Sequence, residues 1–330
     1  MIEIHTCSFR ATRGYSYGAV LCDEIAFWRD ETSANPDTEI LRALRPGLAS
    51  ISGSMLLIAS SPYRKAGVLY NVFARHFGKD DARTLVWRAA TLEMNPSLSP
   101  AVIEEAYADD PASAASEYGA AFRDDINDFV SRDVVEACVI RGRGELLPAR
   151  GITYRAFVDP SGGSSDSMTL AICHRHQDTA ILDAVREVKP PFSPEQVVKD
   201  FAAALRDYHV ARATGDHYGG EWPRERFRLA GIQYVLSEQP KGEIYLNSLP
   251  LLNSGKVQLL DHQRLISQFI GLERRTARSG RDSIDHSPGQ HDDIVNAVCG
   301  GLLLVGTHAP MKINQRALKQ SRQTGLRHAY

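Results

Sequence analysis

Carboxylates recur at three places in the second half of the chain, at the ends of two strand-like runs and at the start of an apolar helical stretch. Asp159 ends one run and precedes a Pro/Ser/Gly turn, and Asp216 ends another before a glycine-rich turn. Asp292 and Asp293 open a third apolar stretch, which has helical character. Carboxylates at the ends of elements can meet although they lie far apart in sequence. These acids therefore predict a site of hard oxygen ligands suited to Mg²⁺ or Mn²⁺.

Each acid also has a simpler interpretation. An aspartate at a strand end commonly caps a turn, and two aspartates at a helix N-terminus are favoured by the helix dipole. Three such positions in one fold still favour a metal site, because packed like charges repel unless a cation or proton intervenes. Asp166 follows Asp159 across the turn. It is a candidate ligand for a second metal, and a solvated turn residue is the alternative.

The elements around these acids follow one order. Three strand-like segments with short connections are expected to be antiparallel neighbours. A helix capped at Ser193 follows, then a strand, a helix and a last strand. The expected ranges are 154–159, 168–174 and 180–188 for the strands, then 193–208, 211–216, 221–230 and 232–236. The order β-β-β-α-β-α-β predicts an RNase H-like fold, an α/β architecture with a mixed sheet flanked by helices.

A second group of polar residues lies in the first part of the chain. Asp23 and Glu24 follow an apolar run, which is the form of a Walker B motif that holds Mg²⁺ and polarises water. Ser60 and Ser61 follow a second apolar run and could sense a γ-phosphate. The alternatives are a solvated acidic turn and an ordinary β-turn. A helix over 36–48 is expected between the two strands, and 85–90 is expected to form a third strand.

A phosphate-binding loop of the form G-x-x-x-x-G-K-[ST] does not occur in the sequence. We therefore expect ATP to bind only if the missing N-terminal part of an ATPase domain is supplied, and ATPase activity of this chain to be doubtful. The chain would then be a fragment, a truncated gene product or one half of a split protein.

Composition excludes several other classes of protein. The 330 residues carry a formal net charge of -2, so any contact with nucleic acid must come from local patches. One such patch is predicted at Arg274, Arg275, Arg278 and Arg281, with Lys241 and Arg264 farther away, and a solvated basic face is the alternative. The five cysteines form no CxxC pair and indicate neither a zinc site nor a disulfide framework. No signal peptide or membrane-spanning run is evident.

These shifts in composition predict four regions. We expect a first domain over 1–125, a turn-rich linker over 126–152, a second domain over 153–307 and a basic tail over 308–330.

In this order and spacing the motifs resemble the large terminase subunit of tailed bacteriophages, and the resemblance covers nearly the whole chain. The residues that carry it are Tyr17–Trp28, Met55–Pro62, Met94–Pro96, Glu117–Phe122, Asp159, Asp216 and His291–Asp293. The resemblance implies the C-terminal part of an ASCE-type (P-loop) ATPase domain followed by an RNase H-like nuclease domain. It also favours Asp293 over Asp292 as the stronger metal ligand.

The implied function is that of a phage or prophage large terminase. It would be a metal-dependent endonuclease that cuts double-stranded concatemeric DNA during genome packaging, in the cytoplasm of the bacterial host. The implied partners are DNA, a small terminase subunit and a portal protein, with no membrane. Two cations would lie about 4 Å apart and would be held by Asp159, Asp216 and either Asp293 or Asp292. Two alternatives remain, another RNase H-like nuclease of the resolvase or transposase type and a non-catalytic remnant that binds portal or small terminase.

Overall fold

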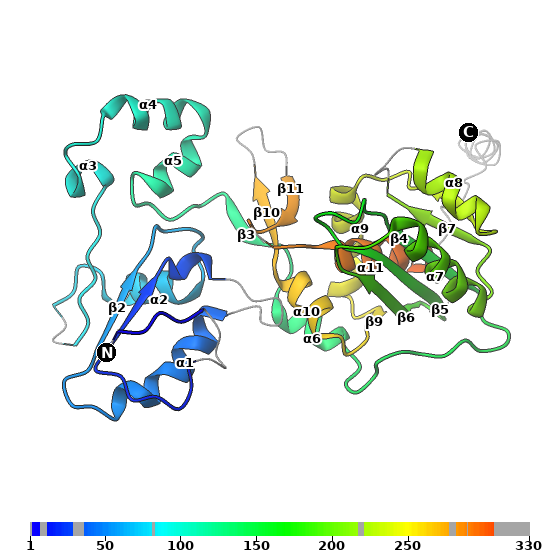
Figure 1. The fold of residues 1–330 in the computed structure, drawn as a ribbon, viewed down its shortest axis with the longest axis horizontal. Helices are drawn as coiled ribbons and strands as arrows, with labels where there is room; N and C mark the ends of the chain where they lie inside the picture. Colours follow the sequence, from blue (N-terminus) through cyan, green and yellow to red (C-terminus); the bar gives the residue numbers. More distant parts are fainter. Residues whose placement is uncertain are drawn as a thin grey trace, which may run out of the picture.

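The structure is a computed structural model that describes residues 2–6, 12–28, 36–80, 83–216, 221–276, 282–288 and 290–306. Figure 1 shows a smaller lobe built from the first elements of the chain and a larger lobe built around a mixed sheet, with a short three-stranded sheet between them. No helix among the described residues is long and apolar enough to cross a membrane.

The smaller lobe contains two parallel strands, β1 (Ala19–Asp23) and β2 (Met55–Ala59). Helix α1 (Pro36–Ala49) packs its apolar side against one face of this pair, in agreement with the prediction. The other elements of the lobe are η1 (Ile25–Phe27), α2 (Gly67–His76), α3 (Thr91–Met94), α4 (Pro100–Asp109) and α5 (Pro111–Glu117).

The prediction of a strand over 85–90 is wrong. These residues form no strand, and the side chains of Leu85 and Trp87 are 92% and 75% exposed. Local apolar character alone produced this prediction. A strand also needs a neighbour with which to exchange backbone hydrogen bonds.

The larger lobe is built on a six-stranded sheet with the order β8-β7-β4-β5-β6-β9. Strands β4 (Tyr154–Asp159), β5 (Met168–His176) and β6 (Thr179–Val188) form an antiparallel meander. Strands β7 (Arg212–Gly215) and β8 (Gln233–Leu236) add in parallel beside β4, and β9 (Val257–Gln258) adds in parallel beside β6. The predicted order β-β-β-α-β-α-β and the mixed α/β class are confirmed.

Helices cover both faces of this sheet (Figure 1). One face packs against α7 (Pro194–Asp207) and α8 (Glu221–Leu229). The other packs against α6 (Arg132–Cys138), α9 (Lys241–Asn253), α10 (Gln263–Ile270) and α11 (Asp293–Gly306). Within α11, Gly300 and Gly301 lie directly over Phe157 and Cys173 of the sheet, where a Cβ atom would clash. The missing side chains let α11 lie close against β4 and β5.

The small sheet between the lobes has the order β11-β10-β3 and combines β3 (Ile126–Asp128), β10 (Leu272–Thr276) and β11 (Asp282–His286). Glu273 of β10 is fully buried and accepts a hydrogen bond of 2.9 Å from the hydroxyl of Tyr63 in the smaller lobe. Residues far apart in sequence therefore meet at this sheet.

The range 126–152, for which the sequence predicts a linker, contains β3 and α6. Phe129, Val135 and Cys138 from this range belong to the same buried core as α11. We therefore propose that the second domain begins near residue 126.

Candidate functional site

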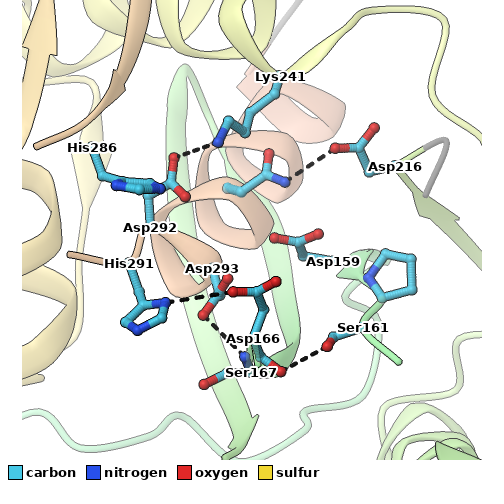
Figure 2. A pocket seen from close by; sticks show the side chains of 12 residues that line it. Asp159, Ser161, Asp166, Ser167, Asp216, Lys241, His286, His291, Asp292 and Asp293 are labelled. Atoms are coloured by element: carbon cyan, nitrogen blue, oxygen red, sulfur yellow. Dashed lines mark hydrogen bonds and ion pairs between the residues drawn. The ribbon is translucent and has the colours of Figure 1, made fainter. Parts of the chain in front are cut away.

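Five predicted acids line one cavity of about 230 Å³ at the end of the large sheet. They are Asp159, Asp166, Asp216, Asp292 and Asp293. Figure 2 shows their side chains gathered around the N-terminal end of α11. The cavity is also lined by Pro160, Ser161, Ser167, Lys241, His286, His291 and Asn296.

Two of the acids are held in place by adjacent parallel strands. In the register of β4 and β7, Val158 lies beside Gly215, so Asp159 and Asp216 leave the sheet at neighbouring positions. The amide of Asp216 donates to the carbonyl of Val158 at 3.3 Å, and the hydroxyl of Tyr234 donates to the carbonyl of Asp216 at 3.1 Å. These backbone contacts fix the point from which the Asp216 side chain enters the cavity.

Helix α11 brings the third group of acids to the cavity. The Oδ2 of Asp293 accepts a hydrogen bond of 3.2 Å from the amide of Ser167, and the hydroxyl of Thr169 donates to the carbonyl of Asp293 at 2.7 Å. Both contacts come from the start of β5 and its preceding turn. They attach the first turn of α11 to the end of the sheet that carries Asp159.

The neighbouring carboxylate of Asp292 has a different set of partners. Its Oδ2 accepts a hydrogen bond of 2.7 Å from the hydroxyl of Tyr245 and lies 2.9 Å from the Nζ of Lys241. Lys241 also lies 3.0 Å from Asp285 of β11. Burial alone would lower the pKa of Lys241, but Asp292 and Asp285 together raise it, so the ammonium stays charged. Lys241 thus neutralises part of the negative charge at one side of the cavity.

The side chain of Asn296 connects the two strand-borne acids. Its Nδ2 donates to Oδ2 of Asp216 at 3.4 Å, and a hydrogen bond from Asn296 also stabilises the charged form of Asp159. The amide oxygen Oδ1 of Asn296 is buried and has no hydrogen-bond partner among the described residues. A buried polar atom without a partner is uncommon and suits a site that takes a ligand.

The carboxylates of the cavity lie where burial and mutual repulsion disfavour their charged form. Burial raises the pKa of Asp159 well above its ordinary value, and the charges of Asp293, Asp216 and Asp292 raise it further. Burial likewise raises the pKa of Asp293 to about 6, with Asp292 and Asp166 adding to the shift. Repulsion between clustered carboxylates raises their pKa values. A bound cation or added protons relieve this repulsion.

Asp166 is the exposed member of the group. Its carboxylate lies 3.7 Å from Nδ1 of His291, and one ligand atom each from Asp166, His291 and Asp293 lie within 4.8 Å of one another. The Oγ of Ser161 donates to the carbonyl of Asp166 at 2.7 Å and holds the turn (Figure 2). The spacing of these ligand atoms suits a cation.

The polar residues predicted in the first part of the chain form a separate group in the smaller lobe. The carboxylate of Glu24 accepts hydrogen bonds from the Oγ of Ser60 at 3.2 Å and from the amide of Ser61 at 3.3 Å. Asp23 ends β1 and lies opposite Ala59 in the parallel register. The structure therefore brings the two polar strand ends together.

Some predicted features are paired or lie outside the described residues. Arg274 forms an ion pair with Asp282, and Arg275 lies 3.2 Å from Glu273, so these two arginines are partly neutralised. Arg278, Arg281 and the basic tail over 308–330 lie outside the described residues.

Sequence reasoning missed several residues of the cavity. Asn296 had a readable signal, because it follows Asp292 and Asp293 at helical spacing of four and three residues and so lies on their face of α11. Sequence reasoning named Lys241 only as a basic residue beside the predicted patch. Neither its position in the cavity nor the contact of Tyr245 with Asp292 could be read from the sequence, because α9 reaches the site only through its tertiary packing against α11.

Comparison with known proteins gives matches among solved structures. No model of a protein family matches the sequence, and no curated protein matches it. The chain is similar to the HK97 bacteriophage large terminase, with 16% identity, a TM-score of 0.45 and coverage of 88% of this chain and 71% of that chain. It is also similar to the large terminase nuclease from thermophilic phage G20c, with 17% identity, a TM-score of 0.48 and coverage of 54% and 99%.

The same nuclease with bound magnesium gives 17% identity, a TM-score of 0.48 and coverage of 54% and 98%. These structures are large terminases and their nuclease domains, the family that the sequence resembles. The likeness is one of fold, so an assignment of chemistry to this chain depends on its own residues.

Proposed function

We propose that the larger lobe is a metal-dependent nuclease that cuts double-stranded DNA, as the nuclease of a large terminase. The observation that carries the proposal is the convergence of Asp159, Asp216 and Asp293 on one cavity from two strand ends and one helix start. The raised pKa values of Asp159 and Asp293 and the unpartnered amide oxygen of Asn296 fit a cation in that place.

The donor set determines which metal suits the site. Its oxygens come from carboxylates and one amide, which favours hard divalent ions such as Mg²⁺ and Mn²⁺. Asp159, Asp216 and Asp293 would hold such ions, with Asp166 as a further candidate. When bound, the metal supplies an activated water and stabilises the charge of the leaving oxygen. Asn296 orients the two strand-borne carboxylates through its hydrogen bonds.

Asp292 and Lys241 have a supporting role in this proposal. The carboxylate of Asp292 is occupied by Tyr245 and Lys241, so it anchors α11, and Asp293 is the acid that serves as ligand. The charged Lys241 faces the same cavity, where an ammonium group suits the phosphate of a DNA backbone.

The proposal is tested by cleavage of supercoiled plasmid in Mn²⁺ with the full chain and its Asp159→Asn variant. Asparagine keeps the shape of the side chain but removes a charge, so the metal loses a ligand and the neighbouring acids lose a repulsive partner. We expect cleavage to fall by at least about 100-fold while the melting temperature of the metal-free protein stays equal or rises. Unchanged cleavage by Asp159→Asn would remove the central residue from the proposed site.

The same assay separates the two alternatives. A resolvase-like or transposase-like nuclease would need branched DNA or a free 3′-end and would leave plain plasmid uncut. A non-catalytic remnant would cut neither substrate, and its Asp159→Asn variant would differ from the parent only in stability.

For the smaller lobe we propose a role in nucleotide binding that depends on a phosphate-binding loop supplied from elsewhere. The hydrogen bonds of Glu24 to Ser60 and Ser61 support this role, since they join a Walker B-like acid to the end of the next strand. We also propose that the chain acts with a portal and a small terminase subunit as its packaging partners.

A further inference from the structure

The first turn of α11 is capped by a side chain from another helix. The Oε1 of Gln268, on α10, accepts hydrogen bonds from the amides of Ile294 at 3.0 Å and Val295 at 3.2 Å. Gln268 is buried and is not among the residues that line the cavity. It acts on the site through the helix start that carries two of the acids.

The position of Asp292 makes this contact unusual. The amide of Asn296 donates to the carbonyl of Asp292 at 2.8 Å, which is the first hydrogen bond of the helix and makes Asp292 the N-cap residue. An aspartate at this position normally turns its carboxylate back onto the second or third amide of its own helix. Here those two amides are Ile294 and Val295, and Gln268 already occupies them.

The consequence is seen in the partners of the two acids. The Oδ2 of Asp292 faces Tyr245 and Lys241, and the Oδ2 of Asp293 faces the amide of Ser167. Neither of these oxygens is engaged with the N-terminal amides of α11. The side-chain oxygen of Gln268 satisfies those donors, so neither carboxylate is needed to cap the helix.

We propose that Gln268 is a positioning residue of the nuclease site: by capping α11 in place of Asp292, it keeps both adjacent carboxylates directed into the cavity. This inference rests on the proposed metal site. Without the Gln268 oxygen, the carboxylate of Asp292 is free to cap its own helix, as an aspartate at the N-cap position ordinarily does. It would then leave Lys241 and Tyr245 and shift the first turn that carries Asp293.

The test compares Gln268→Met, which keeps length without an acceptor, with Gln268→Glu, which restores an acceptor oxygen. Mn²⁺ binding is measured by calorimetry, and the Mn²⁺ concentration for half-maximal plasmid cleavage is measured beside it. We expect Gln268→Met to weaken Mn²⁺ binding by about 10- to 100-fold, the range for groups that orient metal ligands. Gln268→Glu should return to within about threefold of the parent, because it restores that orientation.

Asp110→Ala is the matched control. One oxygen of Asp110 also caps two successive amides, those of Ala112 and Ser113, at the start of α5 in the smaller lobe. Because each loses a helix cap, Gln268→Met and Asp110→Ala should both have a melting temperature lowered by about 2–4 °C. Only Gln268→Met should change the Mn²⁺ requirement. An unchanged Mn²⁺ requirement in Gln268→Met, or an equal loss in Gln268→Glu, would overturn the inference.

A metal-free crystal structure of Gln268→Met separates this inference from the proposed function. We expect the Asp292 carboxylate within hydrogen-bond distance of the Ile294 or Val295 amide. If Asp292 remains on Tyr245 and Lys241, the inference is wrong, whether or not the parent binds Mn²⁺. If the parent neither binds Mn²⁺ nor cuts DNA, the proposed function fails, and the position of Asp292 still decides the role of Gln268 as a cap.

Discussion

Asp292 and Asp293 are adjacent in the chain, yet their side chains diverge, because Asp292 is the N-cap residue of α11 and Asp293 is its first helical residue. Asp292 contacts Lys241 and Tyr245, whereas Asp293 contacts Ser167 and lies near Asp166 and His291. The two acids therefore have different roles although they offer the same chemistry.

This difference gives the first prediction. Asp293→Asn should reduce plasmid cleavage in Mn²⁺ by at least about 100-fold, since a ligand is lost. Asp292→Asn should reduce it less, because its amide oxygen still accepts from Tyr245 and only the pairing with Lys241 weakens. The two variants are compared over a Mn²⁺ titration. A larger loss in Asp292→Asn would reverse the assignment of ligand and anchor.

The pKa of Asp293 predicts how the metal-free protein responds to pH. Burial raises this pKa from 3.8 to about 6, so between these values the folded state holds a proton that the unfolded state has released. Stability is then higher at the acidic end and falls as the pH rises through about 6. The contribution is about 2–3 kcal/mol by linkage.

The measurement is urea unfolding in chelator at pH 4.5 and pH 7 for the parent and for Asp293→Asn. The variant should lose the part of the pH dependence that Asp293 supplies, and Mn²⁺ should restore stability to the parent at pH 7. An identical pH profile for both proteins would exclude a raised pKa at this residue.

At the scale of elements, the site depends on how closely α11 lies against the sheet. A Cβ atom at Gly300 would clash with the ring of Phe157, which lies two residues before Asp159 on β4. Gly300→Ala should destabilise the protein by about 1–3 kcal/mol and reduce cleavage, because overpacking moves the helix away from the strand ends.

Gly242→Ala in α9 is the control, since no atom lies within 4 Å of a Cβ there. It should be neutral or stabilising by up to about 1 kcal/mol, because alanine is the better helix former. Thermal unfolding and plasmid cleavage are measured for both. Equal behaviour of the two variants would contradict the close-packing argument.

The arrangement of the elements also explains which strands and contacts the sequence could predict. The apolar run before Asp159 lies in a central strand with residues in both buried cores, so its local pattern was sufficient. The strand β3 was missed because its partner β10 lies about 145 residues later, and no local pattern reveals a partner at that distance. The cap from Gln268 was missed for the same reason, since α10 and α11 meet only in the folded chain.

At the scale of the whole molecule, β3 and α6 bear on where the larger lobe begins. Phe129, Val135 and Cys138 are buried in the core that supports α11. A fragment that starts near 150 would lose these side chains, and buried side chains of this size contribute about 1.5–3 kcal/mol each.

The prediction is that a fragment over 124–306 unfolds cooperatively and a fragment over 150–306 is markedly less stable. Urea unfolding of both fragments checks it, with Mn²⁺ binding as a measure of the intact site. Equal midpoints would place the boundary after α6. Tyr63→Phe in the full chain should leave the stability of the larger lobe unchanged if that lobe folds as a separate unit.

The pairing of β4 with β7 gives the site a fixed dimension. Asp159 and Asp216 project from neighbouring strands whose separation, about 4.8 Å, is set by backbone hydrogen bonds and is the same for any side chains. The position of Asp293 instead depends on the depth at which α11 rests on the sheet. The distance between the strand ends and the start of α11 can therefore change, whereas the separation of the strands cannot. At the proposed metal site, selection for an ion of another radius would act on small residues such as Gly300 and leave the strand ends unchanged.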